Sequence, residues 1–243
     1  MVPRTTKQLK RLGDKQFFED IKRYIKSSHS FYESKRPELK VLANRLHEEY
    51  SLKDFYKVFN RFWNSGIPKE SILAIYTLQL YKEEFDLDTW IFIKQKIKNV
   101  KSWDKIDNIS LNIVGEILIR NPALEKEIIG FAKGKNSWLK RMAIISTIPS
   151  VRKKDFRLAL KFIEMHLYDK GEYMQKAIGI VLKEIGEQKP ELLKRFILKN
   201  VNMPLTTFFH ATEKMKELRR LRELNGENNI GNNRLDKLFF WRD

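Results

Sequence analysis

Residues 51–80 decide the fold, and they read SLKDFYKVFN RFWNSGIPKE SILAIYTLQL. Ser51 is followed three residues later by Asp54, which resembles a capping box at the start of a helix. Apolar residues recur behind this start at helical spacing: Phe55, Val58, Phe59 and Phe62. Gly66 ends the pattern, and Pro68, which suits a first helical turn, begins another. The stretch therefore predicts two consecutive helices joined by a short turn.

The same pattern continues along the chain. Helix starts follow one another at about 15–20 residues, so helix pairs recur at about 35–40 residues. Their signals are Pro37, Asp88, Trp103, Pro122, Asn136, Asp155, Gly171, Pro190 and Thr206. This period is typical of HEAT or armadillo repeats, and no alternating strand pattern competes with it. We predict an all-α, HEAT-like solenoid of stacked antiparallel helix pairs with a concave basic face; a non-repetitive helical bundle is the alternative.

The domain organisation follows from this reading. A single helical-repeat domain is expected over residues 1–224, of which residues 1–16 form a basic arm. The central helix should run from about Trp103 to Arg120, and the last long helix from about Thr206 to Leu224. Residues 225–243, which are rich in Asn and Gly, are expected to be a loose C-terminal tail.

The charge of the chain points to a polyanionic partner. Lys and Arg number 48 against 31 Asp and Glu, which gives a net charge of +17 and a sequence pI near 9.8. Such an excess favours nucleic acid, although a Lys-rich proteome is the alternative explanation. Nine of these basic residues lie between Phe131 and Phe162, where Asp155 is the one acid. We expect this stretch to face the nucleic acid.

Several classes of site and compartment are disfavoured. The chain has no cysteine, and its four histidines show no metal-ligand spacing, so we expect neither a metal nor another cofactor. No apolar run approaches the roughly 18 residues of a membrane span, and the N-terminus lacks a signal-peptide core. The expectation is a monomer in the cytoplasm, associated with the nucleoid and not with a membrane.

Trp103 and Asp107 are the candidate functional pair. Because they stand four residues apart at the start of the central helix, they share one helical face. An indole beside a carboxylate offers an aromatic surface and a negative charge to a cationic ligand. The alternative is structural: Trp103 anchors the core, Asp104 caps the helix and Asp107 is a solvated residue favoured by the helix dipole.

Three segments of the sequence resemble those of one family, the AlkD-type DNA alkylation repair glycosylases. Residues 103–110, WDKIDNIS, resemble the family's Trp-Asp-x-x-Asp-x-x-Ser segment, and residues 136–145, NSWLKRMAII, its Asn-x-Trp-x-x-Arg-x-Ala segment. Residues 175–184, QKAIGIVLKE, resemble its Gln-Lys-Ala-Ile-Gly-Trp-x-Leu-Arg-Glu helix. Order and spacing agree, and the resemblance covers roughly residues 20–215.

The resemblance implies a glycosylase that removes N3- or N7-alkylated purines from double-stranded DNA while the lesion stays in the duplex. It makes Asp107 the catalytic carboxylate and sets Trp103 and Arg141 beside the lesion nucleotide. Together with the charge pattern it gives the expected DNA-binding residues: Tyr24, Trp138, Lys140, Lys154, Lys176 and Lys183.

The chain departs from the family pattern at two positions. Ile180 stands where the family usually has Trp, and Lys183 replaces its Arg, which keeps the charge but loses the bidentate fork. These departures keep a second hypothesis open, in which the chain is a non-catalytic HEAT-like module that binds nucleic acid or an acidic protein.

Overall fold

The computed structural model describes residues 36–215 and 217–219, and within these residues all regular structure is helical. The predicted basic arm, Tyr24 and the tail from residue 225 lie outside the described residues. The chain divides into two compact units, unit 1 up to Leu124 and unit 2 from Glu125 onward. The single domain over 1–224 and its concave basic face stay predictions, because each unit is described by itself.

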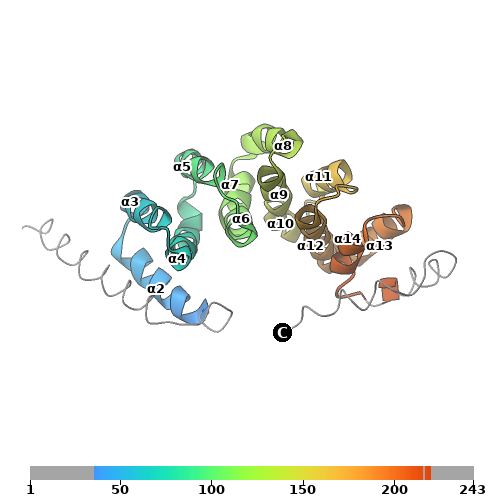
Figure 1. Cartoon of the computed structure of the whole chain (residues 1–243), viewed down its shortest axis with the longest axis horizontal. Coiled ribbons are helices and arrows are strands. Elements are labelled where there is room, and N and C mark those ends of the chain that lie inside the picture. The colour runs from blue at the N-terminus through green and yellow to red at the C-terminus, as the bar shows by residue number, and fades with distance from the viewer. Residues whose placement is uncertain (1–35, 216, 220–243) are drawn as a thin grey trace, which may run out of the picture. The chain divides into compact units, whose positions relative to one another are not determined.

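Unit 1 is a two-layered stack of helices. One layer contains α3 and α5, and the other contains α2, α4 and α6 (Figure 1). The helices of unit 1 are α2 (Arg36–Glu49), α3 (Leu52–Trp63), α4 (Pro68–Leu78), η1 (Gln79–Glu84), α5 (Leu87–Ile97), α6 (Trp103–Ile109), η2 (Ser110–Val114), α7 (Gly115–Arg120) and η3 (Pro122–Leu124).

Unit 2 has the same two-layered construction. One layer contains α8, α11 and α13, and the other contains α9 with α10, then α12 and α14 (Figure 1). The helices of unit 2 are α8 (Glu125–Lys133), α9 (Ser137–Ile145), α10 (Ile148–Arg152), α11 (Arg157–His166), α12 (Glu172–Gln188), α13 (Pro190–Lys199) and α14 (Leu205–Ala211). The stacking of helices in both units fits the predicted helical solenoid.

The pair α3–α4 forms as its sequence predicts. The Ser51 hydroxyl caps α3 by accepting the backbone N–H of Asp54 at 3.3 Å. The apolar stripe of α3 is buried: Phe55, Val58, Phe59 and Phe62. Gly66 has a φ of +75°, a conformation that residues with a side chain rarely adopt, and Pro68 is the first residue of α4. The turn residues therefore set both ends of this pair.

The predicted central helix over Trp103–Arg120 is confirmed, with one irregularity. It consists of α6, a π-helical turn η2, and α7, and the junction residues Ser110 and Gly115 keep right-handed helical φ and ψ angles. In the π turn the backbone N–H of Gly115 bonds to the carbonyl of Ser110, five residues back. Such turns recur near functional sites.

Three predicted helix signals are corrected. The helix expected from Thr206 to Leu224 is interrupted, because α14 ends at Ala211 and residues 212–215 form a turn and a connection. Residues 217–219 are helical again, and residues 220–224 lie outside the described residues. Pro122 begins only the short 3-10 turn η3 before α8. Asp155 is not the N-cap of α11, which is Phe156, although its carboxylate does accept the backbone N–H of Arg157 at 3.1 Å.

Helix α12 is the element of unit 2 on which α9, α13 and α14 pack. Its two glycines allow close approach: a Cβ at Gly179 would lie 2.5 Å from the Cβ of His210 and 2.8 Å from the carbonyl oxygen of Thr207. A Cβ at Gly186 would lie 2.5 Å from Leu193 Cδ2. The close contact between α12 and α14 therefore requires glycine, which has no Cβ, at position 179.

Gly179→Ala is expected to destabilise unit 2 by about 1–3 kcal/mol, because the added methyl group must push α14 away from α12. The matched control is Gly130→Ala in α8, where nothing lies within 4 Å of the added Cβ. There the gain in helix propensity should stabilise the protein by about 0.5–1 kcal/mol. Urea unfolding of both variants measures the two free energies, and equal effects would contradict the close approach at Gly179.

Candidate nucleic-acid interface

Trp103 and Asp107 stand one helical turn apart on α6, as predicted. The Trp103 side chain is 55% exposed, so the alternative in which it anchors the core is wrong. Asp107 is half-buried beside it and takes part in contacts of its own. The helix cap is Ser102 and not Asp104, and the Ser102 hydroxyl donates a hydrogen bond to the Asp104 carboxylate.

The rest of α6 holds this pair toward solvent. Ile106 and Ile109 are fully buried and fix the opposite side of the helix in the core of unit 1. The ammonium group of Lys105 lies 5.4 Å from the centre of the Trp63 ring, which ties the first turn of α6 to the end of α3. The exposed indole and the neighbouring carboxylate therefore project from a helix whose orientation is fixed on two sides.

Arg141 belongs to unit 2 and is buried on α9, with only 3% of its surface exposed. Its guanidinium donates a hydrogen bond to the backbone carbonyl of Tyr173, in the first turn of α12. A phosphate bound by Arg141 must approach this site, or the guanidinium must turn from that carbonyl. The meeting of Arg141 with Trp103 and Asp107 stays a prediction, since the residues belong to different units.

Tyr173 is a candidate that the sequence reading missed. Its side chain is 53% exposed, and its ring centre lies 5.5 Å from that of Trp138 with the planes tilted by 39°. A helical projection could have found it, because Tyr173 precedes Ile180 by seven residues and so shares its helical face. Ile180 holds the position where the resembling family has Trp. The predicted DNA-binding Trp138 is thus one half of an aromatic pair between the starts of α9 and α12.

Lys176 and Lys183 flank Gly179 on α12, and the imidazole of His210 on α14 lies among them. Lys176 pairs with Glu172 at 2.6 Å, and Lys183 pairs with Glu213 at 3.0 Å. Burial lowers the pKa of His210, and the positive charges of Lys176, Lys183 and Arg141 lower it further. The two predicted DNA-binding lysines of α12 therefore lie on either side of the point where Gly179 meets His210.

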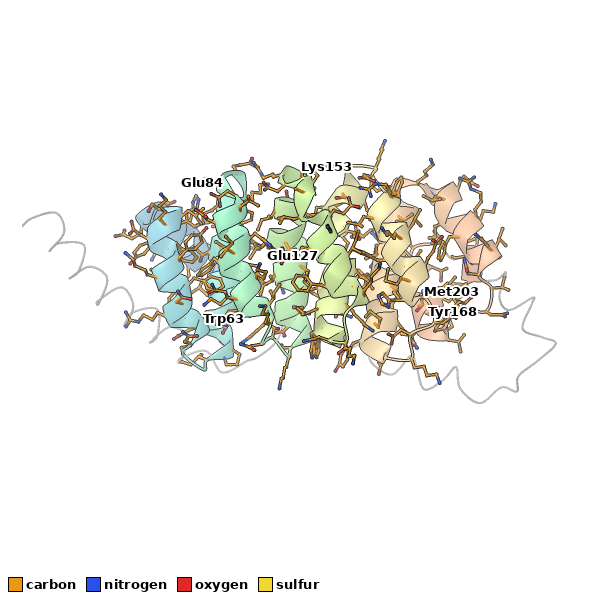
Figure 2. The ribbon with its side chains drawn as sticks, turned by 90° about the horizontal axis from the view of Figure 1, so that it is seen from above. Trp63, Glu84, Glu127, Lys153, Tyr168 and Met203 are labelled. Atoms are coloured by element: carbon orange, nitrogen blue, oxygen red, sulfur yellow. The ribbon has the colours of Figure 1, made fainter. Side chains whose placement is uncertain are left out.

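The basic stretch between Phe131 and Phe162 does not form one patch. Lys140 is in the first half of α9, whereas Lys154 follows α10, so the rest of α9, a turn and all of α10 lie between them. Figure 2 shows Lys153 at one end of unit 2 and Tyr168 at the other. Arg152 and Arg157 are already paired within unit 2, where they form two-point ion pairs with Glu184 and Glu125 at 2.6–2.9 Å.

In residues 36–215 and 217–219, no cluster of three or more His, Asp or Glu side chains is arranged to bind a metal ion. Across the same part of the chain, every helix is too short or too polar to span a bilayer.

Comparison with protein families decides the relationship. The family model described as "DNA alkylation repair enzyme" matches residues 5–215. The chain belongs to the DNA alkylation repair enzyme family. Comparison with curated protein sequences gives no significant match.

Solved structures show the same fold as this DNA alkylation repair family member. One is described as a predicted DNA alkylation repair enzyme from Enterococcus faecalis, with a TM-score of 0.66, 17% identity, and coverage of 82% of this chain and 95% of the other. AlkD2 from Streptococcus mutans has a TM-score of 0.60 and 17% identity, with 82% and 98% covered. A further S. mutans protein, smu.31, has a TM-score of 0.56 and 16% identity, with 87% and 98% covered.

The stability of this family member should fall in mild acid because of two histidines in unit 2. Burial lowers the pKa of both His166, whose Nε2 lies 2.9 Å from the carbonyl oxygen of Ala132, and His210. The unfolded chain takes up protons near pH 6.5 while the folded chain resists them, so the free energy of unfolding decreases as the pH falls below about 7.

Urea unfolding at pH 7.5 and pH 5.5 measures this loss. His166→Gln and His210→Gln should each reduce the difference between the two pH values. Equal stability of the wild-type protein at both pH values would contradict the lowered pKa values of these side chains.

Proposed function

We propose that this protein is a DNA glycosylase that removes cationic N3- or N7-alkylated purines from duplex DNA. The observation that carries the proposal is the pair on α6, an exposed Trp103 with the half-buried carboxylate of Asp107 one turn away. Membership of a DNA alkylation repair family supplies the substrate class. The protein acts as a monomer in the cytoplasm, at the nucleoid, and needs no cofactor or metal.

The chemistry suits these two side chains. An alkylated purine carries a positive charge, so it leaves with the electron pair of the glycosidic bond and becomes neutral without a strong general acid. The sugar then develops oxocarbenium-like positive charge, as in glycoside hydrolysis. The Asp107 carboxylate stabilises that charge and orients the water that bonds to C1′ and releases a proton. The Trp103 ring adds a cation–π attraction of about 0.5–2 kcal/mol.

DNA binding in this proposal is shared among separate basic groups. Lys140, Lys154, Lys176 and Lys183 attract phosphates without regard to sequence, Trp138 contacts the backbone, and Arg141 binds the phosphate beside the lesion. Tyr24 is proposed as a further contact from the N-terminal segment. The lesion stays in the duplex, so selectivity comes from the lability of the alkylated base itself.

A non-catalytic nucleic-acid or protein-binding module is the second candidate. The observations that favour it are on α12, where the aliphatic Ile180 replaces an aromatic residue of the resembling proteins and Lys183 is held in an ion pair with Glu213. Both features weaken the contacts available to a lesion nucleotide.

Asp107→Asn should lower the release of 7-methylguanine or 3-methyladenine from methylated duplex DNA by at least about a hundredfold, because the amide cannot stabilise a cation. The matched control is Asp104→Asn, which removes the same charge one turn earlier on α6 and should retain most of the activity. Chromatography of the released base measures the rate, and duplex affinity should change little in either variant. If the wild-type protein binds duplex DNA with an affinity that falls steeply with salt concentration, yet releases no base, the hypothesis of a non-catalytic module is correct.

Lys140→Ala and Lys154→Ala should each weaken duplex binding independently of sequence. Each lost phosphate contact lowers the slope of log affinity against log salt by about 0.9. Because these lysines lie far apart in unit 2, the double variant should show the sum of both losses. Lys161→Ala, on α11 in the other layer, is the control and should bind as the wild type does. An unchanged slope for Lys140→Ala and Lys154→Ala would exclude both residues from the interface.

A further inference from the structure

The paired rings of Trp138 and Tyr173 form an aromatic surface on unit 2, and backbone hydrogen bonds hold both residues in place. Trp138 is fixed because Asn136 caps α9 by accepting the backbone N–H groups of Trp138 and Leu139 at 2.9 and 3.3 Å. Tyr173 is fixed because the buried Arg141 binds its backbone carbonyl. Both anchors act on the backbone, so the Tyr173 ring itself, 53% exposed, is not needed to hold them. The Tyr173 ring, tilted by 39° to the ring of Trp138, is the more exposed of the two.

Cationic side chains continue from this aromatic surface along α12. Lys176 and Lys183 follow Tyr173 by three and ten residues, which corresponds to about 4.5 and 15 Å along the helix axis. All three share one face of the helix, and the contact of Gly179 with His210 lies between the two lysines.

Aromatic rings followed by two cationic side chains on the same helical face match one class of ligand. A nucleic-acid strand with unpaired bases presents π faces to stack on rings and phosphates to bind ammonium groups. An intact duplex keeps its bases stacked, so it can use the lysines but not the ring faces. A purely apolar partner would gain from the rings but would have to bury the charges of Lys176 and Lys183, which is unfavourable.

We propose that unit 2 binds a DNA strand with unpaired bases, one base stacking on the Trp138–Tyr173 pair and the following phosphates binding Lys176 and Lys183. The proposal extends the DNA binding of the proposed function to a strand with exposed bases, and it requires no base release. Glu172 and Glu213, which pair with these lysines, give up the ammonium groups to phosphates in the complex.

Fluorescence anisotropy with a labelled ten-nucleotide oligo(dT) tests the proposal, because stacking and charge respond differently to salt. Tyr173→Ala should weaken binding about tenfold without changing the salt slope, and Tyr173→Phe should bind as the wild type does. Lys176→Ala and Lys183→Ala should each lower the slope by about 0.7. Tyr168→Ala is the control, since Tyr168 is 61% exposed at the end of α11, and it should not change the affinity.

The same measurements on Asp107→Asn protein separate this proposal from glycosylase activity. In the Asp107→Asn background, a tenfold loss of oligo(dT) affinity on Tyr173→Ala would support the strand site. This result does not depend on whether the wild-type protein releases base. The proposal is overturned if wild type binds duplex but not oligo(dT), or if Tyr173→Ala and Tyr168→Ala bind alike. A changed salt slope for Tyr173→Ala would also overturn it, and melting temperatures check that each variant folds.

Discussion

Burial of apolar stripes between two layers is the constraint on which this protein depends. Helices as short as the five residues of α10 and no longer than the 17 of α12 are marginal in water by themselves. They persist here because each stripe packs on helices of its own and of the other layer, as Phe55, Phe59 and Phe62 do in unit 1. The polar faces are then free to differ between helices, and the candidate interface is built from those faces.

Part of the positive charge of unit 2 is compensated by ion pairs with glutamates of the same unit. Two arginines of unit 2 form two-point ion pairs with Glu125 and Glu184, and the hydrogen bond from Arg157 holds the pKa of Glu125 below its ordinary value. The lysine pairs differ in geometry, because each ammonium group makes a single contact with its carboxylate, whereas each arginine binds its glutamate by two hydrogen bonds. Surface lysines can therefore exchange an acidic partner for a phosphate at small cost, whereas the arginine pairs remain part of the architecture.

The sequence predicted those features that depend on local chemistry. Capping at Ser51, the turn at Gly66 and the start at Pro68 each act within a few residues, so their positions could be read directly. It did not predict the end of α14 at Ala211, where the Thr212 hydroxyl bonds to the carbonyl of Phe208 and the chain turns. It also treated the basic residues between Phe131 and Phe162 as one stretch facing the nucleic acid, because charge counted along a sequence does not show how α9, α10 and α11 distribute it.

The π turn at Ser110–Val114 fixes an orientation at some distance from itself. It contains one residue more than an α-helical turn, and each residue of a helix advances by about 100°. Loss of one residue there would return the backbone to regular winding and rotate everything upstream by that angle relative to α7. Either the indole and carboxylate would swing away from solvent, or Ile106 and Ile109 would leave the core. The number of residues in the π turn thus sets the direction in which Trp103 and Asp107 point. Deletions in this segment should therefore be rare among active relatives.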